Sequence, residues 1–321
     1  LMLFVFAFLA WAAAGKSFSL VGMLDSTMVK ATPIALAALA GTISERSSII
    51  NIGIEGMLLS GAFAGVLVAS VTDSGLIGLA GAVVTGGVLA AFLAVMSIKY
   101  RVDQIITGVV INLFALGLTS FLTAQVLVAR PELNDAPIFR GIKIPILGDI
   151  PVIGPVLFNQ TLIVYGMYVL VAAFTIGFFH TRWGLRTRAV SEHPGAADTL
   201  GVNVYFHQYL GTIIGGMVAG FGGAYFTLGT VGRFDENITA GRGFIGLAAM
   251  IFGRWHPIGG LAAALVFGFS DSLAQKLAIL QTPIPSEFLL MAPYIVTIIV
   301  VAGVVGRSRP PAAEGKPYVK E

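Results

Sequence analysis

Long apolar stretches without a charged residue alternate with short polar segments along most of the chain. Such stretches predict membrane-spanning helices, because about 20 apolar residues in helical form cross the hydrocarbon layer of a bilayer. The clearest candidates are residues 74–98, 104–129, 150–179, 199–232 and 288–306. Shorter stretches at 56–72, starting near Ile52, and at 257–280 predict two more spans.

Three apolar segments are too short to span as simple helices. Residues 1–15 are expected to be part of a first span; a cleaved signal peptide is the alternative, since Ala12-Ala13-Ala14 resembles a cleavage site. Residues 31–44 and 244–253 each end in a polar break and predict half-helices or broken spans. Altogether about 9–10 transmembrane segments are expected.

Composition agrees with this pattern. Apolar residues make up 56% of the chain and charged residues 11%, against about 25% in soluble domains. Mean hydropathy is +0.90. A soluble enzyme, a disordered chain and a nucleic-acid binder are excluded, and the predicted fold class is an all-α polytopic membrane protein. The absence of cysteine excludes disulfides and thiolate metal sites.

Basic residues set the predicted orientation. Lys99 and Arg101 share one short turn, three arginines follow within 182–188, and four basic residues lie in the tail 307–321. These segments fall on one side if the spans alternate, so that side is predicted to be cytoplasmic. The proline-rich loop 130–149 lies on the other side and is expected to be irregular.

A parallel internal repeat is predicted within a single transmembrane domain, residues 1–306. The sequence LAALAG at 36–41 resembles LAAMIFG at 247–253, and each is followed by a polar break and a glycine-rich span. The two pseudo-repeats would cover about 1–98 and 207–306. Paired interrupted segments in equivalent halves indicate a transport pathway, although short Ala/Gly/Leu matches also arise by chance.

No catalytic or metal site is predicted. The letters G-x-G-x-x-G occur at 241–246, but they follow a membrane span, and the acidic residue expected about 20 positions on is absent. These glycines are expected to let a helix start close to its neighbour, and other small-x-x-x-small pairs are expected to pack helices. No complete P-loop is present, and the four histidines have no ligand spacing.

Polar residues at membrane depth are the candidate pathway residues. A charge at the centre of a spanning helix costs about 2.5–3.5 kcal/mol on insertion scales, so it should face a cavity or a partner. Glu55 and Lys276 could equally lie near an interface and reach water. The candidates are Asn51, Glu55, Asn112, Asn237 and Asp271.

The polar loop 182–206 predicts a short surface helix. Ser191 can cap a helix over 192–200, with Pro194 in its first turn and Gly201 ending it as a left-handed residue. The helix would present Ala196, Ala197 and Leu200 as a small apolar face. This face suits docking to another protein, and an ordinary connector is the alternative.

Three segments resemble one family. GLRTRAVSEHPGAADTLGVN at 184–203 resembles the cytoplasmic coupling loop of ABC importer permeases of the branched-chain amino acid, ribose and simple-sugar group. SERSSIINIGIEG at 44–56 and GRGFIGLAAMIFGRW at 241–255 are similar to the nucleoside and simple-sugar branch. Ser191 stands where the family more often has glycine.

The resemblance implies a permease subunit of the plasma membrane that binds no cofactor itself. ATP and Mg would be bound by a separate ABC ATPase, a second related permease would complete the pathway, and an extracytoplasmic binding lipoprotein would deliver a nucleoside or sugar. The residues implied for coupling to the ATPase are Gly184, Arg186, Arg188, Glu192, Pro194, Ala196, Ala197, Leu200 and Gly201.

Two other classes remain open from the residues alone. A secondary transporter driven by an ion gradient would carry protons or Na⁺ on Glu55 and Asp271. A scaffold subunit is less favoured, because broken spans and buried polar groups cost stability without serving a scaffold.

Overall fold

The computed structural model describes residues 19–279, 291 and 309–320, and these residues are mainly helical. The predicted spans at 1–15 and 288–306 lie outside the described residues. The long helices are α2 (Leu20–Glu45), α3 (Ile54–Thr72), α4 (Gly75–Ala94), α5 (Gln104–Leu122), α7 (Leu162–His180), α10 (Val204–Phe226) and α12 (Pro257–Ile279).

Shorter elements connect them. Single π-helical turns extend α4, α5 and α10 as η1 (Val95–Lys99), η2 (Thr123–Leu127) and η5 (Thr227–Val231). The remaining elements are η3 (Pro131–Asn134), β1 (Ile142–Lys143), η4 (Leu147–Asp149), α6 (Ile153–Leu157), β2 (Asn159–Gln160), α8 (Arg182–Glu192), α9 (Pro194–Thr199) and α11 (Arg242–Phe252).

Among the described residues, seven helices are long and apolar enough to cross a membrane, and α11 is a shorter apolar helix. This confirms the predicted all-α polytopic class and the short segment near 244–253. The proline-rich loop forms only short turns and a two-stranded hairpin, in which Ile142 pairs with Gln160. The internal repeat stays a prediction.

The half-helix predicted at 31–44 is wrong, because these residues are the inner part of the 26-residue helix α2. Asp25 and Lys30 interrupted the apolar pattern, although both have partners in the fold. The Asp25 carboxylate accepts a hydrogen bond of 2.8 Å from Gln160, and Lys30 interacts electrostatically with Asp271 and Arg242. The break follows α2 instead, at residues 46–53.

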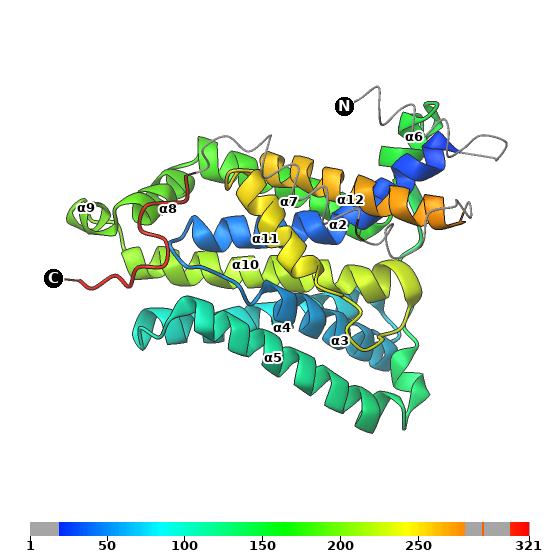
Figure 1. Cartoon of the computed structure of the whole chain (residues 1–321), viewed down its shortest axis with the longest axis horizontal. Coiled ribbons are helices and arrows are strands. Elements are labelled where there is room, and N and C mark those ends of the chain that lie inside the picture. Colours follow the sequence, from blue (N-terminus) through cyan, green and yellow to red (C-terminus); the bar gives the residue numbers. More distant parts are fainter. Residues whose placement is uncertain (1–18, 280–290, 292–308, 321) are drawn as a thin grey trace.

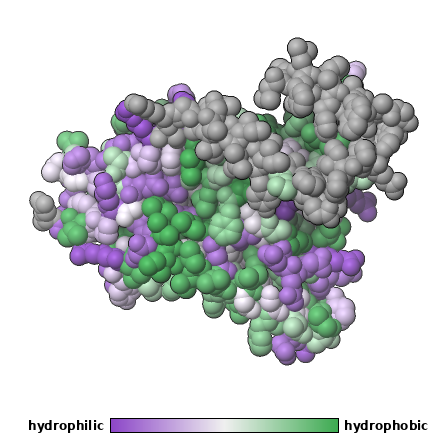
Figure 2. Space-filling view, viewed as in Figure 1, coloured by the Kyte–Doolittle hydropathy of each residue, from purple (hydrophilic) through white to green (hydrophobic). Residues whose placement is uncertain are grey.

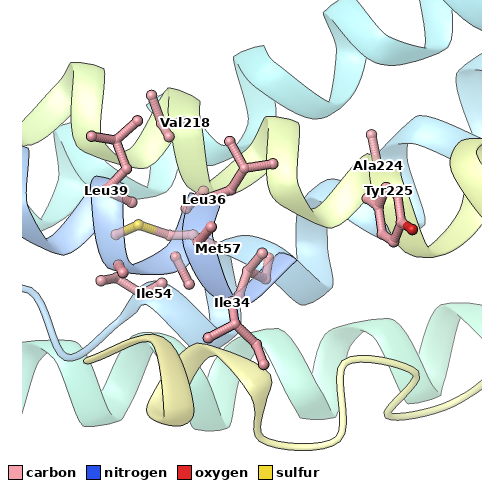
Figure 3. Close-up of a cluster of buried hydrophobic side chains, with 14 of the residues drawn as sticks. Ile34, Leu36, Leu39, Ile54, Met57, Val218, Ala224 and Tyr225 are labelled. Carbon is pink, nitrogen blue, oxygen red and sulfur yellow. The ribbon is translucent and has the colours of Figure 1, made fainter. Parts of the chain in front are cut away.

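Helix α2 forms the centre of the bundle and packs against α10, α11 and α12. Every residue of α2 from Ala31 to Glu45 is buried. Figure 3 shows Leu36 and Leu39 of α2 close to Met57 of α3 and Val218 of α10. By contrast, α5 lies at the edge and exposes apolar side chains such as Leu113 and Phe121, as expected for a helix that faces lipid or a partner.

Small residues allow the closest helix contacts. A Cβ atom at Gly220 of α10 would lie 2.2 Å from the carbonyl oxygen of Ala82 in α4, and one at Gly86 would lie 2.2 Å from that of Gly216. On other sides of α10, a Cβ at Gly223 would lie 2.0 Å from the Leu58 oxygen of α3. The predicted role of these glycines in helix packing is confirmed.

The basic segments lie at one end of the bundle. In Figure 1, α8, α9 and the C-terminal tail occupy the end opposite α6. Hydrophilic residues gather towards this end in Figure 2, whereas apolar surface covers the middle of the molecule. We call this the cytoplasmic end after the orientation predicted from the excess of Lys and Arg, which stays a prediction.

Replacement of Gly220 by valine should destabilise the bundle by at least about 1–3 kcal/mol, because the new side chain meets backbone atoms that cannot move aside. Thermal unfolding in detergent would measure the effect. The matched control is Gly117→Val on α5, where a Cβ atom meets nothing within 4 Å. Equal melting temperatures for the two variants would contradict the close packing of α4 on α10.

Candidate translocation site and coupling surface

Helices α3 and α11 both begin beside the carboxylate of Glu55. Glu55 lies in the first turn of α3 and is 8% exposed. Its Oε1 accepts hydrogen bonds from the Thr239 hydroxyl at 2.6 Å and the Gly241 N–H at 2.9 Å. Its Oε2 accepts one of 2.6 Å from the Gly243 N–H. The carboxylate therefore caps α11, whose first N–H groups have no partner within the helix.

The glycines of the 241–246 motif make this contact possible. Gly241 has φ +78°, a left-handed conformation that favours glycine. A Cβ atom at Gly243 would lie 2.7 Å from the Cα of Glu55, and one at Gly246 would lie 2.3 Å from the Cβ of Ala37 in α2. The expectation that these glycines let a helix start against its neighbours is confirmed.

Asn112 holds the start of α3 from the other side. Its Oδ1 accepts a hydrogen bond of 2.7 Å from the Gly56 N–H, and its Nδ2 donates one of 2.9 Å to the Ile52 carbonyl. Asn112 lies well inside the span formed by α5 and η2. The start of α3, and with it the start of α11, therefore lies at membrane depth, as in transporters with discontinuous helices.

The predicted pathway amides are not gathered around one cavity. Asn51 is fully buried, and its Nδ2 donates to the Ser44 hydroxyl at 3.3 Å. Asn237 is exposed in the loop before α11, with φ 55°. Because Asn51 and Asn112 use their amide groups inside the protein, they hold the helix break in this conformation. Their contact with a substrate stays a prediction.

Three charges lie together beside the start of α11. Arg242 pairs with Asp271 of α12 at 3.1 Å, and both side chains are about a quarter exposed. Lys30 of α2 interacts electrostatically with both. Asp271 thus finds its partner across the bundle instead of on its own helix at Lys276. Partly exposed charges at membrane depth should face a polar cavity or another subunit, which makes this cluster the best-placed candidate for the pathway.

A second junction, at the cytoplasmic end, was missed by sequence reasoning. The Trp255 indole N–H donates to Glu45 at 2.5 Å, and Arg46 Nε donates to the Trp255 carbonyl at 2.6 Å. These contacts tie the α11–α12 connection to the end of α2. The run Arg254 to Pro257 marks the end of the short segment, but no sequence signal connects it with residues 209 positions away.

The aromatic ring of Phe179 lies against two arginine side chains at this junction. The Phe179 ring stacks on His256 with centroids 4.6 Å apart, and the guanidinium carbons of Arg46 and Arg188 lie 5.3 and 5.1 Å from its centroid. Burial, and then the charge of Arg46, lowers the pKa of His256. The imidazole is therefore neutral at pH 7 and adds no third positive charge. Cation–π attraction holds the two guanidinium groups against the ring.

The surface helix differs from the prediction at its start. Helix α9 begins at Pro194, and its cap is His193, whose Nδ1 accepts from the Ala196 N–H at 3.2 Å. Ser191 lies inside α8, where its hydroxyl donates to the Arg188 carbonyl, so the predicted Ser191 cap is wrong. A serine can cap only when the chain leaves it non-helical. Gly201 has φ +78°, as predicted.

The predicted coupling residues divide into two groups. Ala197 is 2% exposed and packs against Val190 and Val204, so it faces inward and not towards a docking partner. Leu200, in contrast, is 83% exposed. The other inward or half-buried positions are Gly184, Arg188 and Pro194, and the other exposed ones are Arg186, Glu192, Ala196 and Gly201.

Gly184 has a packing role. A Cβ atom there would lie 2.1 Å from the Gly177 carbonyl oxygen, so glycine lets α8 fold back tightly on α7. Helix α8 is thereby fixed to a membrane-spanning helix, and α9 follows directly from it. A force applied to α9 would therefore reach the spans through α8.

The fold and these two junctions define a multi-pass membrane permease with a broken helix at membrane depth and short helices on one face. The family model for the permease component of the branched-chain amino acid transport system matches residues 23–301, and the chain belongs to this family. The resemblance seen in the coupling loop is thus confirmed.

Three relatives are similar along most of their length. The chain is 41% identical to the guanosine ABC transporter permease NupQ of Bacillus subtilis (strain 168), over 93% of this chain and 96% of NupQ. It is 40% identical to the nucleoside ABC transporter permease NupC of Lactococcus lactis subsp. cremoris (strain MG1363), with the same two coverages. It is 26% identical to the guanosine ABC transporter permease NupP of Bacillus subtilis (strain 168), over 82% of this chain and 76% of NupP.

Replacement of Glu55 by glutamine should lower the free energy of unfolding by about 1–3 kcal/mol. The amide would place an N–H group against donors that now meet a carboxylate oxygen, and α11 would lose the negative charge at its start. Thermal unfolding and protease sensitivity near residue 241 would measure the effect.

The matched control for this substitution is Glu236→Gln, an exposed carboxylate in the loop that leads to α11. We expect the control variant to have the same melting temperature as the unmodified chain. If Glu55→Gln were as stable as the control, Glu55 would not anchor α11.

Proposed function

We propose that this chain is a permease subunit of an ATP-driven ABC importer of nucleosides in the plasma membrane. The main support for this proposal is the 41% identity to a guanosine permease along nearly the whole of both chains. Similarity to a second nucleoside permease from another organism supports the same substrate class. The permease would form part of the translocation pathway and would carry out no chemical reaction itself.

The energy would come from a separate ABC ATPase, which binds ATP and Mg on the cytoplasmic side. The exposed surface of α9, together with Leu200 directly after its last residue, is our proposed docking site. Movement there would pass through α8 to Phe179 and Arg46, and from Arg46 to the end of α2. The same junction holds Trp255, so α11 would move together with α2.

A second permease would close the pathway. The relatives support a related, non-identical partner, since NupQ and NupP are two different guanosine permeases in one organism. The partly exposed cluster of Lys30, Arg242 and Asp271 would face the passage between the subunits. An extracytoplasmic binding lipoprotein would deliver the nucleoside on the opposite side from α9.

The gradient-driven alternative has little structural support. The Glu55 carboxylate already accepts three hydrogen bonds, and Asp271 is paired with Arg242. A carboxylate so engaged is a poor carrier of protons, because protonation would break its contacts. No observation in the described residues favours this alternative.

The experiment is nucleoside uptake into proteoliposomes that contain this chain, its ATPase, its partner permease and its binding lipoprotein. We expect uptake of labelled guanosine to require ATP on the side of α9 and to survive an ionophore that collapses ion gradients. Uptake that follows an ion gradient without ATP would overturn the proposal.

Replacement of Leu200 by aspartate should weaken attachment of the ATPase at least about tenfold, the effect of losing a contact worth about 2 kcal/mol. Co-purification in detergent measures attachment. The control is Ile146→Asp, because Ile146 is also 83% exposed but lies in the loop that leads to α6, and α6 is at the end of the bundle opposite α9 in Figure 1. Equal ATPase recovery with both variants would exclude Leu200 from the docking surface.

A further inference from the structure

The C-terminal tail lies across the cytoplasmic end of the bundle. Residues 309–320 run as a non-helical segment past α8, the last part of the chain in Figure 1. The Ala313 N–H donates a hydrogen bond of 2.9 Å to the Ser191 carbonyl at the end of α8. Ala313 is 6% exposed, so this part of the tail is seated in the protein and not merely close to it.

The tail next contacts the turn between α2 and α3. The Gly315 N–H donates to the Ser48 carbonyl at 3.3 Å. Gly315 has φ +74°, and a Cβ atom there would lie 2.8 Å from Cδ1 of Ile50, so glycine is required on both grounds. Beside it, Glu314 interacts with Glu45 at the end of α2, and burial raises the pKa of the Glu314 carboxyl.

The end of the tail contacts α9. The Tyr318 ring packs on the cluster of Val190, Ala197 and Val204, which come from α8, α9 and α10. It also lies 5.4 Å from the ring of Tyr205, measured between centroids. Lys320 pairs with Asp198 of α9 at 3.5 Å. Ala197, one of the three residues that sequence reasoning assigned to the docking face, is therefore covered by the chain's own tail.

These contacts connect α9 with the turn between α2 and α3, two elements that are otherwise linked through α8 and α10. The Ser48 hydroxyl donates to the Val190 carbonyl of α8 at 3.0 Å, which is the direct link from the turn. The tail adds a parallel connection from α9 itself to the same turn. The turn leads directly into α3, which starts at Ile54 and carries in its first turn Glu55, the residue that caps α11.

We propose that residues 309–320 form a coupling strap that passes the movement of α9 to the turn between α2 and α3. The strap rests on the proposed function, since α9 must be moved by an ATPase for the strap to act. It holds the inner side of α9, while the outer side with Leu200 stays free for docking. Without the strap, a movement of α9 reaches the start of α3 through α8 and α10 alone, and its pull on the turn is weaker.

A labelling experiment tests the seating of the strap independently of transport. The chain has no cysteine, so one introduced cysteine reports on its own position. In membranes, Ala313→Cys should react with a maleimide at least about fivefold more slowly than Val319→Cys, because reaction at a seated position must wait for local opening. Val319 is 50% exposed and serves as the matched control. Equal rates would overturn the strap.

A transport experiment tests coupling in the full assembly. Deletion of residues 310–321 should leave attachment of the ATPase unchanged but lower guanosine uptake per ATP hydrolysed at least about fivefold, the lower range of coupling between two sites. Unchanged uptake per ATP would overturn the proposal, and so would loss of the ATPase, which would make the tail a docking element instead.

If the chain that lacks residues 310–321 does not fold stably, a milder variant can be used. Tyr318→Ala combined with Lys320→Ala removes the contacts to α9 and leaves those of Ala313 and Gly315. It should show the same fall in uptake per ATP, whereas Val319→Ala should not. Absence of ATP-driven uptake in the unmodified assembly would refute the proposed function. The labelling rates would then still test whether the tail is seated against the bundle.

Discussion

A helix that begins inside a membrane needs acceptors for its first N–H groups, since no water is present to supply them. In this protein Glu55 meets that need for α11 with both carboxylate oxygens. The requirement explains several features together. Both oxygens accept from the first N–H groups of α11, Gly241 takes a left-handed φ, and Gly243 lacks a Cβ so that the backbone can approach Glu55 at the start of α3.

The second constraint is that charged groups within the spans are bound by polar or charged partners. Asp25 is bound by Gln160, and Asp271 by Arg242 with Lys30 nearby. Such pairing lets α2 carry charges in its outer half while its inner half is completely buried. The contacts come from residues more than 20 positions apart, so each depends on the fold being formed. The cluster of Arg242 and Asp271, both about a quarter exposed, lies beside the helix break.

Sequence patterns predicted what depends on local composition. The spans that lack charges, the short helix near 244–253, the packing glycines and the left-handed Gly201 were all found in this way. The patterns failed where a distant partner decides the outcome. The predicted helix at 31–44 was too short, because the partners of Asp25 and Lys30 cannot be seen in the sequence. Ala197 was predicted to face outward, because the residue that covers it, Tyr318, is distant in the sequence. The capping role moved from Ser191 to His193 because α8 continues through Ser191.

The two junctions together restrict how the protein can move. Glu55 of α3 binds the first residues of α11. Glu45 at the end of α2 binds Trp255, which lies just beyond the last residue of α11. Between these points Gly246 lies against Ala37, so α11 is fixed to the α2–α3 unit along its length. Interfaces packed so closely do not slide gradually. A conformational change must therefore carry α2, α3 and α11 as one body, and the surface that opens or closes is the exposed side of that body, where Arg242 lies against Asp271 of α12.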